Sequence, residues 1–118
     1  MTSPAPAASD LDRTLAALAD PVRRQAIDML RRGPRRPAEM AAAFDVSLPV
    51  MSKHLRVLRQ GRLIEEMPVE DDARMRLYRL RPEPFDDLGA WLEEVQAFWS
   101  DQLDAFKDHV ARRRRSPR

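Results

Sequence analysis

The segment spanning residues 47–61 constrains the fold more than any other part of the chain. Its apolar residues recur at spacings of three, four and three, the periodicity of one helix face; they are Leu48, Met51, Leu55 and Leu58. At about 100° per residue, the opposite face carries Pro49, Lys53, Arg56 and Gln60. Ser47 is a suitable N-cap and Gly61 ends the helix. The pattern predicts a short helix with one buried face and one basic face.

Three shorter helices are predicted before this segment, over residues 10–19, 21–32 and 37–44. Leucines at helical spacing indicate the first of them. Asp20 followed by Pro21 indicates the start of the second, because an acidic N-cap and a proline at the first helical position favour helix entry. Gly33 ends the second helix, and Pro37 starts the third.

A β-hairpin and a long helix are predicted after the amphipathic segment. Strands are expected over residues 62–69 and 74–81. The inward face of the second strand stays open, because one side carries Met75 and Leu77 and the other carries Tyr78 and Leu80. The final helix has a wide apolar stripe formed by Leu88, Trp91, Leu92, Val95, Phe98, Trp99, Leu103, Phe106 and Val110.

The charge distribution suggests two surfaces with different partners. Residues 21–64 contain ten Arg and Lys against three Asp and Glu, whereas residues 65–111 contain five against thirteen. A basic middle followed by an acidic segment is compatible with a nucleic-acid partner, and equally with a solvated basic face.

The chain has no cysteine, which excludes disulfides, thiolate metal sites and cysteine nucleophiles and fits a reducing compartment. The Ala, Pro and Ser-rich N-terminus lacks the basic and apolar regions of a signal peptide. No stretch approaches the roughly 18–20 apolar residues of a membrane span. We therefore expect a cytoplasmic protein without a membrane partner.

The predicted order of elements is that of winged helix-turn-helix proteins, and three motifs resemble the ArsR/SmtB family of bacterial regulators. They are the second-helix entry LADPVRRQAI at 18–27, the recognition-helix segment SKHLRVL at 52–58 and the wing segment RMRLYRL at 74–80. The resemblance covers roughly residues 10–110. It implies a mostly α fold with a small β-hairpin, a winged helix-turn-helix with a long C-terminal dimerisation helix. The function it implies is sequence-specific regulation of transcription.

Three features depart from the family pattern: the residue before the first wing strand, the cap of the third helix, and the metal ligands. The family commonly has Gly just before the Leu that opens the first wing strand, whereas this chain has Arg62 there. The third helix has Arg36 in place of the usual Ser or Thr cap, and it lacks the cysteine pair of the metal-sensing members. His109 in the last helix has no second histidine at ligand spacing. The missing metal ligands and the Trp and Phe pattern of the last helix resemble a metal-independent branch of the family, whose members often repress their own operon. We therefore expect no metal and no cofactor.

The resemblance and the helix geometry together give the candidate DNA-binding residues: Ser47, Pro49, Val50, Ser52, Lys53, His54, Arg56, Arg74 and Arg76. Arg56 is the strongest candidate for a base contact, because a guanidinium pairs bidentately with guanine. Val50 could pack on a thymine methyl group. Ser52 and Lys53 could contact bases or phosphates, and His54 could be a structural group or a phosphate contact.

The wing arginines, Arg74 and Arg76, flank an acidic hairpin tip at residues 70–72. The acidic tip argues against deep insertion into the minor groove, so phosphate contacts are expected from these two side chains. Arg23, Arg24, Arg35 and Arg36 are expected to add non-specific electrostatic attraction.

The last helix, expected over residues 84–111, would be about 40 Å long at about 1.5 Å per residue, more than a domain of this size can cover. The candidate dimer-interface residues are Leu11, Leu15, Leu18, Val95, Phe98, Trp99, Leu103 and Phe106. The alternative is that the stripe packs across its own domain. A twofold dimer would present two recognition helices to a palindromic double-stranded operator, with half-sites one helical turn apart.

The expected organisation is a flexible tail over 1–9, a winged-helix domain over 10–111 and a basic tail over 112–118. Within the domain, the recognition helix is expected over about 48–60 and the wing over about 62–81.

A winged-helix protein-interaction module is the alternative function, although the basic face of the recognition helix favours DNA. An enzyme is not expected, because the chain has two histidines, no cysteine and no Gly-rich phosphate loop. The sequence leaves open a small-molecule inducer bound between the helices of the dimer, and whether the protein represses or activates.

Overall fold

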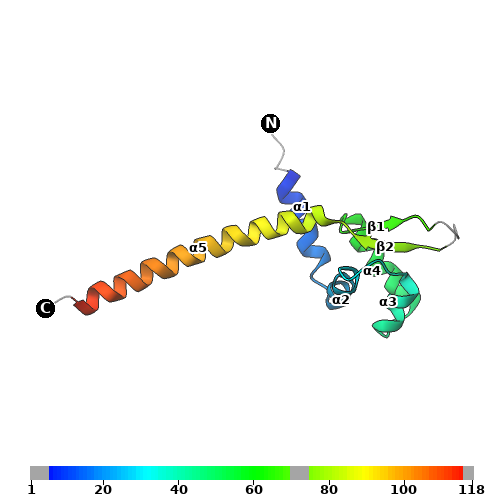
Figure 1. The fold of residues 1–118 in the computed structure, drawn as a ribbon, viewed down its shortest axis with the longest axis horizontal. Helices are drawn as coiled ribbons and strands as arrows, with labels where there is room; N and C mark the ends of the chain where they lie inside the picture. The colour runs from blue at the N-terminus through cyan, green and yellow to red at the C-terminus, as the bar shows by residue number, and fades with distance from the viewer. Residues whose placement is uncertain (1–5, 70–74, 116–118) are drawn as a thin grey trace. The chain divides into compact units, whose positions relative to one another are not determined.

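A computed structural model describes the backbone of residues 6–69 and 75–115. Its elements in chain order are α1 (Pro6–Ala17), α2 (Pro21–Leu30), α3 (Pro37–Ala43), α4 (Leu48–Gln60), β1 (Ile64–Met67), β2 (Leu77–Leu80) and α5 (Pro82–Arg115) (Figure 1). The chain divides into one compact unit up to Asp86 and a second unit from Asp87 onward. Helices, a helix-turn-helix, a two-stranded hairpin and a long last helix confirm the predicted winged helix-turn-helix architecture.

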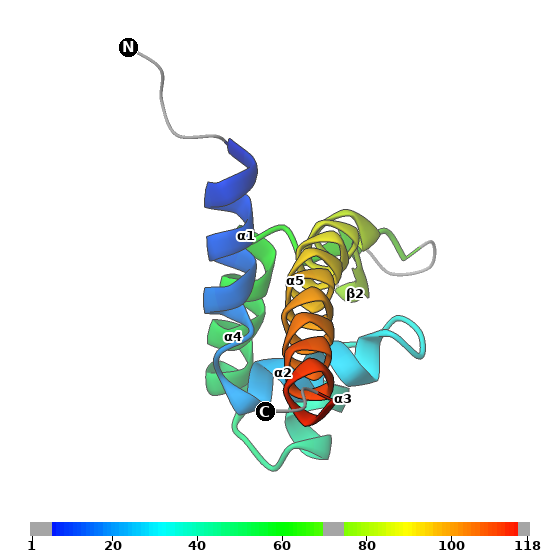
Figure 2. The same cartoon turned by 90° about the vertical axis from the view of Figure 1, so that its left-hand side faces the viewer.

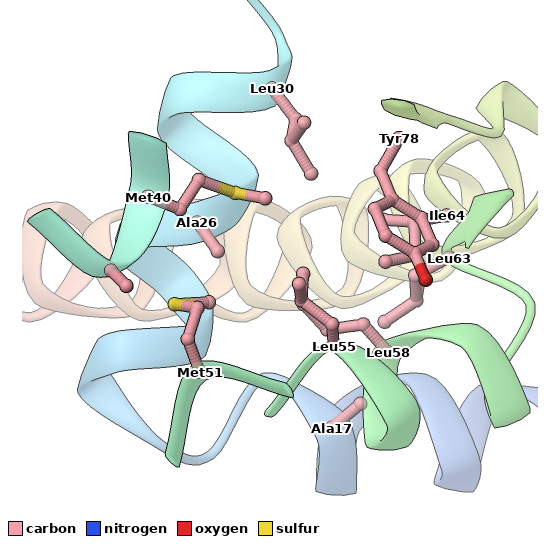
Figure 3. Close-up of a cluster of buried hydrophobic side chains, with 11 residues drawn as sticks. Ala17, Ala26, Leu30, Met40, Met51, Leu55, Leu58, Leu63, Ile64 and Tyr78 are labelled. Atoms are coloured by element: carbon pink, nitrogen blue, oxygen red, sulfur yellow. The ribbon is translucent and has the colours of Figure 1, made fainter. Parts of the chain in front are cut away.

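The first unit is built around one buried cluster to which all of its helices and both strands contribute (Figure 3). Its members are Ala17, Ala26, Leu30, Met40, Ala41, Met51, Leu55, Leu58, Leu63, Ile64 and Tyr78. Figure 2 shows α1 beside α4, in agreement with the presence of Ala17 and Leu58 in the same cluster. Phe85, in the first turns of α5, also packs against this core. Among the described residues, every helix is too short or too polar to span a lipid bilayer.

The amphipathic character predicted for α4 is confirmed at three of its four apolar positions. Met51, Leu55 and Leu58 are buried, whereas Leu48 is 49% exposed. The expectation that Leu48 faces the core was wrong, because its position in the first turn lies beyond the edge of the core. The remaining three side chains are enough to fix which face of α4 points outward.

The hairpin pairs β1 and β2 antiparallel, with Ile64 opposite Leu80 and Met67 opposite Leu77. Tyr78 is buried, so its side of β2 faces the core. The backbone of Tyr78 also pairs with Arg35, through N–H···O distances of 3.0 and 2.9 Å. This bridge ties the loop between α2 and α3 to the base of the wing.

The ends of several elements differ from the predicted ones. Both strands are shorter than expected, α1 begins at Pro6 rather than at residue 10, and α5 continues through Arg115 instead of ending at 111. Residues 112–115 were expected to belong to a basic tail, but arginine is a good helix former and cations are favourable near a helix C-terminus. The four arginines therefore form the last turn of α5.

Arg62 occupies the left-handed region of backbone conformation, with φ of 62°, directly after the end of α4. Gly61, one residue earlier, is α-helical with φ of −78°. The family that the sequence resembles commonly has glycine at the position of Arg62, and glycine adopts this conformation without the clash of a Cβ atom. The chain thus carries a strained arginine where the fold favours glycine.

Replacing Arg62 with glycine is expected to raise the free energy of unfolding by about 0.5–1 kcal/mol, because relief of the left-handed strain exceeds the added entropy of the unfolded chain. Thermal unfolding should show a melting temperature higher by about 2–6 °C. Arg62→Ala is the control, since alanine removes the charged side chain but keeps the Cβ atom. Equal melting temperatures for the two variants would contradict the explanation.

Candidate nucleic-acid interface

The outward face of α4 is polar and basic, and it starts at a well-defined cap. The Ser47 hydroxyl accepts a hydrogen bond from the Val50 N–H at 3.3 Å, which confirms Ser47 as the N-cap. The predicted contact residues beyond it are exposed: Pro49, Val50, Ser52, Lys53 and Arg56. In the part of the chain that the structure describes, neither Lys53 nor Arg56 forms an ion pair. Their charges are therefore available to a ligand.

A basic cleft of about 460 Å³ lies between α4, the start of α3 and the base of the wing. Four guanidinium groups line it, from Arg36, Arg56, Arg59 and Arg76. Within residues 6–69 and 75–115, no acidic side chain lines this cleft. The cleft is continuous with the basic face of α4 through Ser52 and Arg56, so one surface of the first unit concentrates cations.

The wing contributes one described candidate. Arg76 is exposed and lines the cleft, with its Nε atom 3.8 Å from Oε1 of Glu66. Arg74, the other predicted wing contact, lies outside the described residues. Cations at the base of a wing can contact the DNA backbone beside the groove that holds the recognition helix.

His54 lies at the junction between α4 and the start of α2, away from the outward face. Its side chain is 17% exposed, and its Nδ1 atom lies 4.0 Å from Asp20 Oδ1 and 3.5 Å from Arg23 Nη1. These neighbours favour the structural alternative for His54. A phosphate contact remains a prediction.

Asp20 is the N-cap of α2, as predicted. Its carboxylate accepts hydrogen bonds from the N–H groups of Val22 and Arg23 at 2.8 and 3.2 Å. Desolvation raises the pKa of Asp20, but these two hydrogen bonds and the charges of His54 and Arg23 outweigh it, so the pKa lies below its usual value. The ionised carboxylate is therefore the form that stabilises the fold.

A carboxyl group whose pKa is lowered by folding contributes stability above its unfolded pKa of about 3.9, and loses it as the pH falls through the folded value. We expect the melting temperature of Asp20→Asn to match the wild type near neutral pH, because asparagine is an equally good N-cap. Below about pH 4 the wild type should lose the contribution of the ionised Asp20 to the free energy of unfolding, whereas the variant has no such group to protonate. Melting curves recorded across this range check the expectation, and parallel pH profiles would contradict it.

Two of the arginines expected to attract DNA also have structural partners. The Arg23 Nε–H donates to the carbonyl of Ala17 at 2.6 Å, and Arg24 Nη1 donates to the carbonyl of Leu18 at 2.7 Å. Both interactions satisfy carbonyl groups at the end of α1. The signal in the sequence was the position of these cations shortly after a helix C-terminus, which favours positive charge.

The apolar stripe of α5 is exposed in the second unit. Trp99 is 60% exposed and Phe106 is 64% exposed, while Val95 is half-buried. Phe98 and Trp99 contact each other edge to face, with ring centroids 5.9 Å apart. Exposed aromatic patches of this kind usually mark protein interfaces. The structure leaves the predicted interface role of these residues untested.

The three N-terminal leucines that were predicted at the same interface, two in α1 and Leu18 directly after it, differ in accessibility. Leu15 is exposed, Leu11 is half-buried, and Leu18 packs against the core of its own unit. A dimer contact through α1 is therefore expected to depend on Leu15 more than on Leu18.

In the residues that the structure describes, no group of three or more His, Asp or Glu side chains is arranged to hold a metal ion.

Sequence comparisons identify relatives that regulate transcription. A helix-turn-helix domain family matches residues 18–66. The HTH-type transcriptional regulator Rv2034 of Mycobacterium tuberculosis is 35% identical over 95 residues, which is 80% of this chain and 83% of that protein. The transcriptional repressor SdpR of Bacillus subtilis is 32% identical over 56 residues, which is 48% of this chain and 62% of that protein.

Structure comparisons agree with the sequence relatives. The crystal structure of an ArsR family transcriptional regulator matches with a TM-score of 0.69 and 34% identity, over 85% of this chain and 97% of that one. The solution structure of the homodimeric winged helix-turn-helix DNA-binding domain of Mb0332 from Mycobacterium bovis matches with a TM-score of 0.60 and 26% identity. That match covers 82% of this chain and 90% of the other.

Proposed function

This chain belongs to the ArsR family of winged helix-turn-helix transcriptional regulators, and we propose that it binds a palindromic operator as a homodimer and represses its own operon without a metal ion. Its relatives are transcriptional regulators and not enzymes. The observation that carries the proposal is the outward face of α4, where Lys53 and Arg56 are exposed on the side opposite the buried residues Met51, Leu55 and Leu58. An α-helix of this kind fits the major groove and offers donors to base edges.

The dimer is supported by the apolar face of α5 and by the homodimeric state of the Mb0332 domain. Two such helices pairing across a twofold axis would remove both aromatic stripes from water. Each large side chain buried contributes about 1.5–3 kcal/mol. The same axis would relate two α4 helices, which makes a palindromic operator the matching DNA.

Repression and metal independence are supported by separate observations. The SdpR relative is a transcriptional repressor. The absence of cysteine removes the thiolate ligands that a metal sensor of this family would use. A dimer bound across a promoter would then block transcription until an inducer, whose chemistry the proposal leaves open, releases it.

Selection of duplexes from a random-sequence library tests the proposal directly. We expect repeated rounds with the full chain to enrich a palindrome, with unchanged enrichment when a chelator is present. The promoter region of its own gene should contain that palindrome and should compete for binding. Failure to enrich any sequence would favour the protein-interaction module instead, and a chelator-sensitive result would overturn the metal-independent mechanism.

A further inference from the structure

Glu66 holds two of the four arginines that line the basic cleft. Its Oε1 atom lies 3.0 Å from Arg59 Nη1 and 3.8 Å from Arg76 Nε. The Tyr78 hydroxyl donates to the same oxygen at 3.1 Å, and it accepts from Arg59 Nη1 at 3.5 Å. One carboxylate therefore joins the last turns of α4 to both strands at the base of the wing.

The hydrogen bond from the buried tyrosine restrains this carboxylate, whose side chain is 42% exposed. Tyr78 is 4% exposed and is anchored in the core, so its hydroxyl has a defined position. A hydrogen bond from a fixed hydroxyl restricts the carboxylate more than an exposed ion pair alone would, since isolated surface pairs contribute little. Arg59 is thus hydrogen-bonded to a restrained carboxylate, and Arg76 is drawn toward the same oxygen by the longer ion pair.

The neighbouring residue Glu65 makes a similar pair of contacts that do not involve the cleft. Its Oε2 atom lies 2.8 Å from Arg79 Nε, and its Oε1 atom lies 3.8 Å from Arg81 Nε. Successive residues of a strand point to opposite faces, and neither Arg79 nor Arg81 lines the cleft. Glu65 therefore provides a matched control within the same strand.

We propose that Glu66 is a positioning residue that holds Arg59 and Arg76 in the cleft and thereby raises the ratio of operator affinity to non-operator affinity. The proposal rests on the DNA-binding function proposed above. Unrestrained arginines would pair with phosphates on any duplex, and this attraction carries no sequence information. Glu66 restrains these arginines, and its own negative charge repels phosphate. It therefore lowers the affinity for non-operator DNA, while it keeps the guanidinium groups oriented for one docked geometry.

The test compares Glu66→Gln with the control Glu65→Gln, using the enriched duplex and a scrambled duplex of equal length at several salt concentrations. Glutamine keeps an acceptor for the Tyr78 hydroxyl but removes the charge. We expect Glu66→Gln to bind the scrambled duplex about three- to tenfold more tightly. The slope of log affinity against log salt concentration should steepen by about one for each newly contacted phosphate. The ratio of the two affinities should fall about tenfold, whereas Glu65→Gln should keep the wild-type values.

A second comparison shows whether Glu66 acts through the cleft arginines. In an Arg59→Gln background, the effect of Glu66→Gln should shrink, because one of the two restrained cations is gone. Melting temperatures are measured for each variant, and Glu66→Ala should change the scrambled-duplex affinity in the same direction as Glu66→Gln.

Equal affinities and salt slopes for the Glu66→Gln and Glu65→Gln variants would overturn the proposal, as would a Glu66→Gln effect unchanged by loss of Arg59. These outcomes are distinct from failure of the proposed function. If the wild type prefers no sequence, the scrambled duplex still measures what Glu66 does to phosphate binding.

Discussion

Replacing Trp99 with glutamate is expected to convert the protein into monomers and to weaken operator binding by about 10²- to 10⁴-fold, the range lost when two linked binding events become separate. Trp99 is 60% exposed in the centre of the α5 stripe. In a twofold dimer the substitution would place two carboxylates in an apolar interface, where an unpaired charge is costly to bury. Sedimentation velocity and a binding titration with the enriched duplex measure the two consequences.

Ala97→Glu is the matched control for this substitution. Residue 97 lies about 160° around the helix from Trp99 at about 100° per residue, and its side chain is exposed. The control adds the same charge to the polar face, so it should stay dimeric and bind normally. If Trp99→Glu also remained dimeric with full affinity, the dimer interface would have to lie elsewhere.

Replacing Arg56 with alanine is expected to remove most of the sequence preference without unfolding the domain. A bidentate arginine–guanine contact discriminates by about 1–3 kcal/mol, and a dimer makes the contact once in each half-site, so the total is about 2–6 kcal/mol. Arg56 is exposed and forms no ion pair with the described residues, so the melting temperature should stay within about 2 °C of the wild type. Competition titrations with single-base variants of the enriched duplex measure the preference.

Arg31→Ala is the matched control for Arg56→Ala, because it removes an exposed cation at the C-cap of α2 whose ion-pair partner among the described residues is Asp28. It should leave the ranking of duplexes unchanged. A ranking that is also unchanged for Arg56→Ala would show that another residue of α4 discriminates between bases.

The fold was predictable where local signals agreed with one another. In α4, the periodicity, the Ser47 cap and the Gly61 end all predict the same helix, and the structure places its buried face where the spacing does. Asp20 followed by Pro21 fixed the start of α2 for the same reason. The exposed basic residues of α4 followed directly from the buried ones.

The features that could not be predicted depend on contacts between distant residues. The inward face of β2 is decided by the backbone pairing of Tyr78 with Arg35, which are far apart in the sequence. Nothing in the sequence indicated the proposed positioning role of Glu66, because that role depends on the fold of the hairpin, which brings Glu66 next to Tyr78 and Arg59. Leu48 matched the periodicity but lay beyond the end of the core, which spacing alone does not define.

In the proposed mechanism two copies of α4 read two halves of one operator, and the cysteine-free sequence allows a direct measurement of this. A single cysteine introduced as Gln60→Cys, at the exposed end of α4, can carry a DNA-cleaving iron chelate. We expect two symmetric clusters of strand cleavage on the enriched duplex, one in each half-site and about one helical turn apart. One cluster alone, or cleavage spread evenly along the duplex, would contradict the claim.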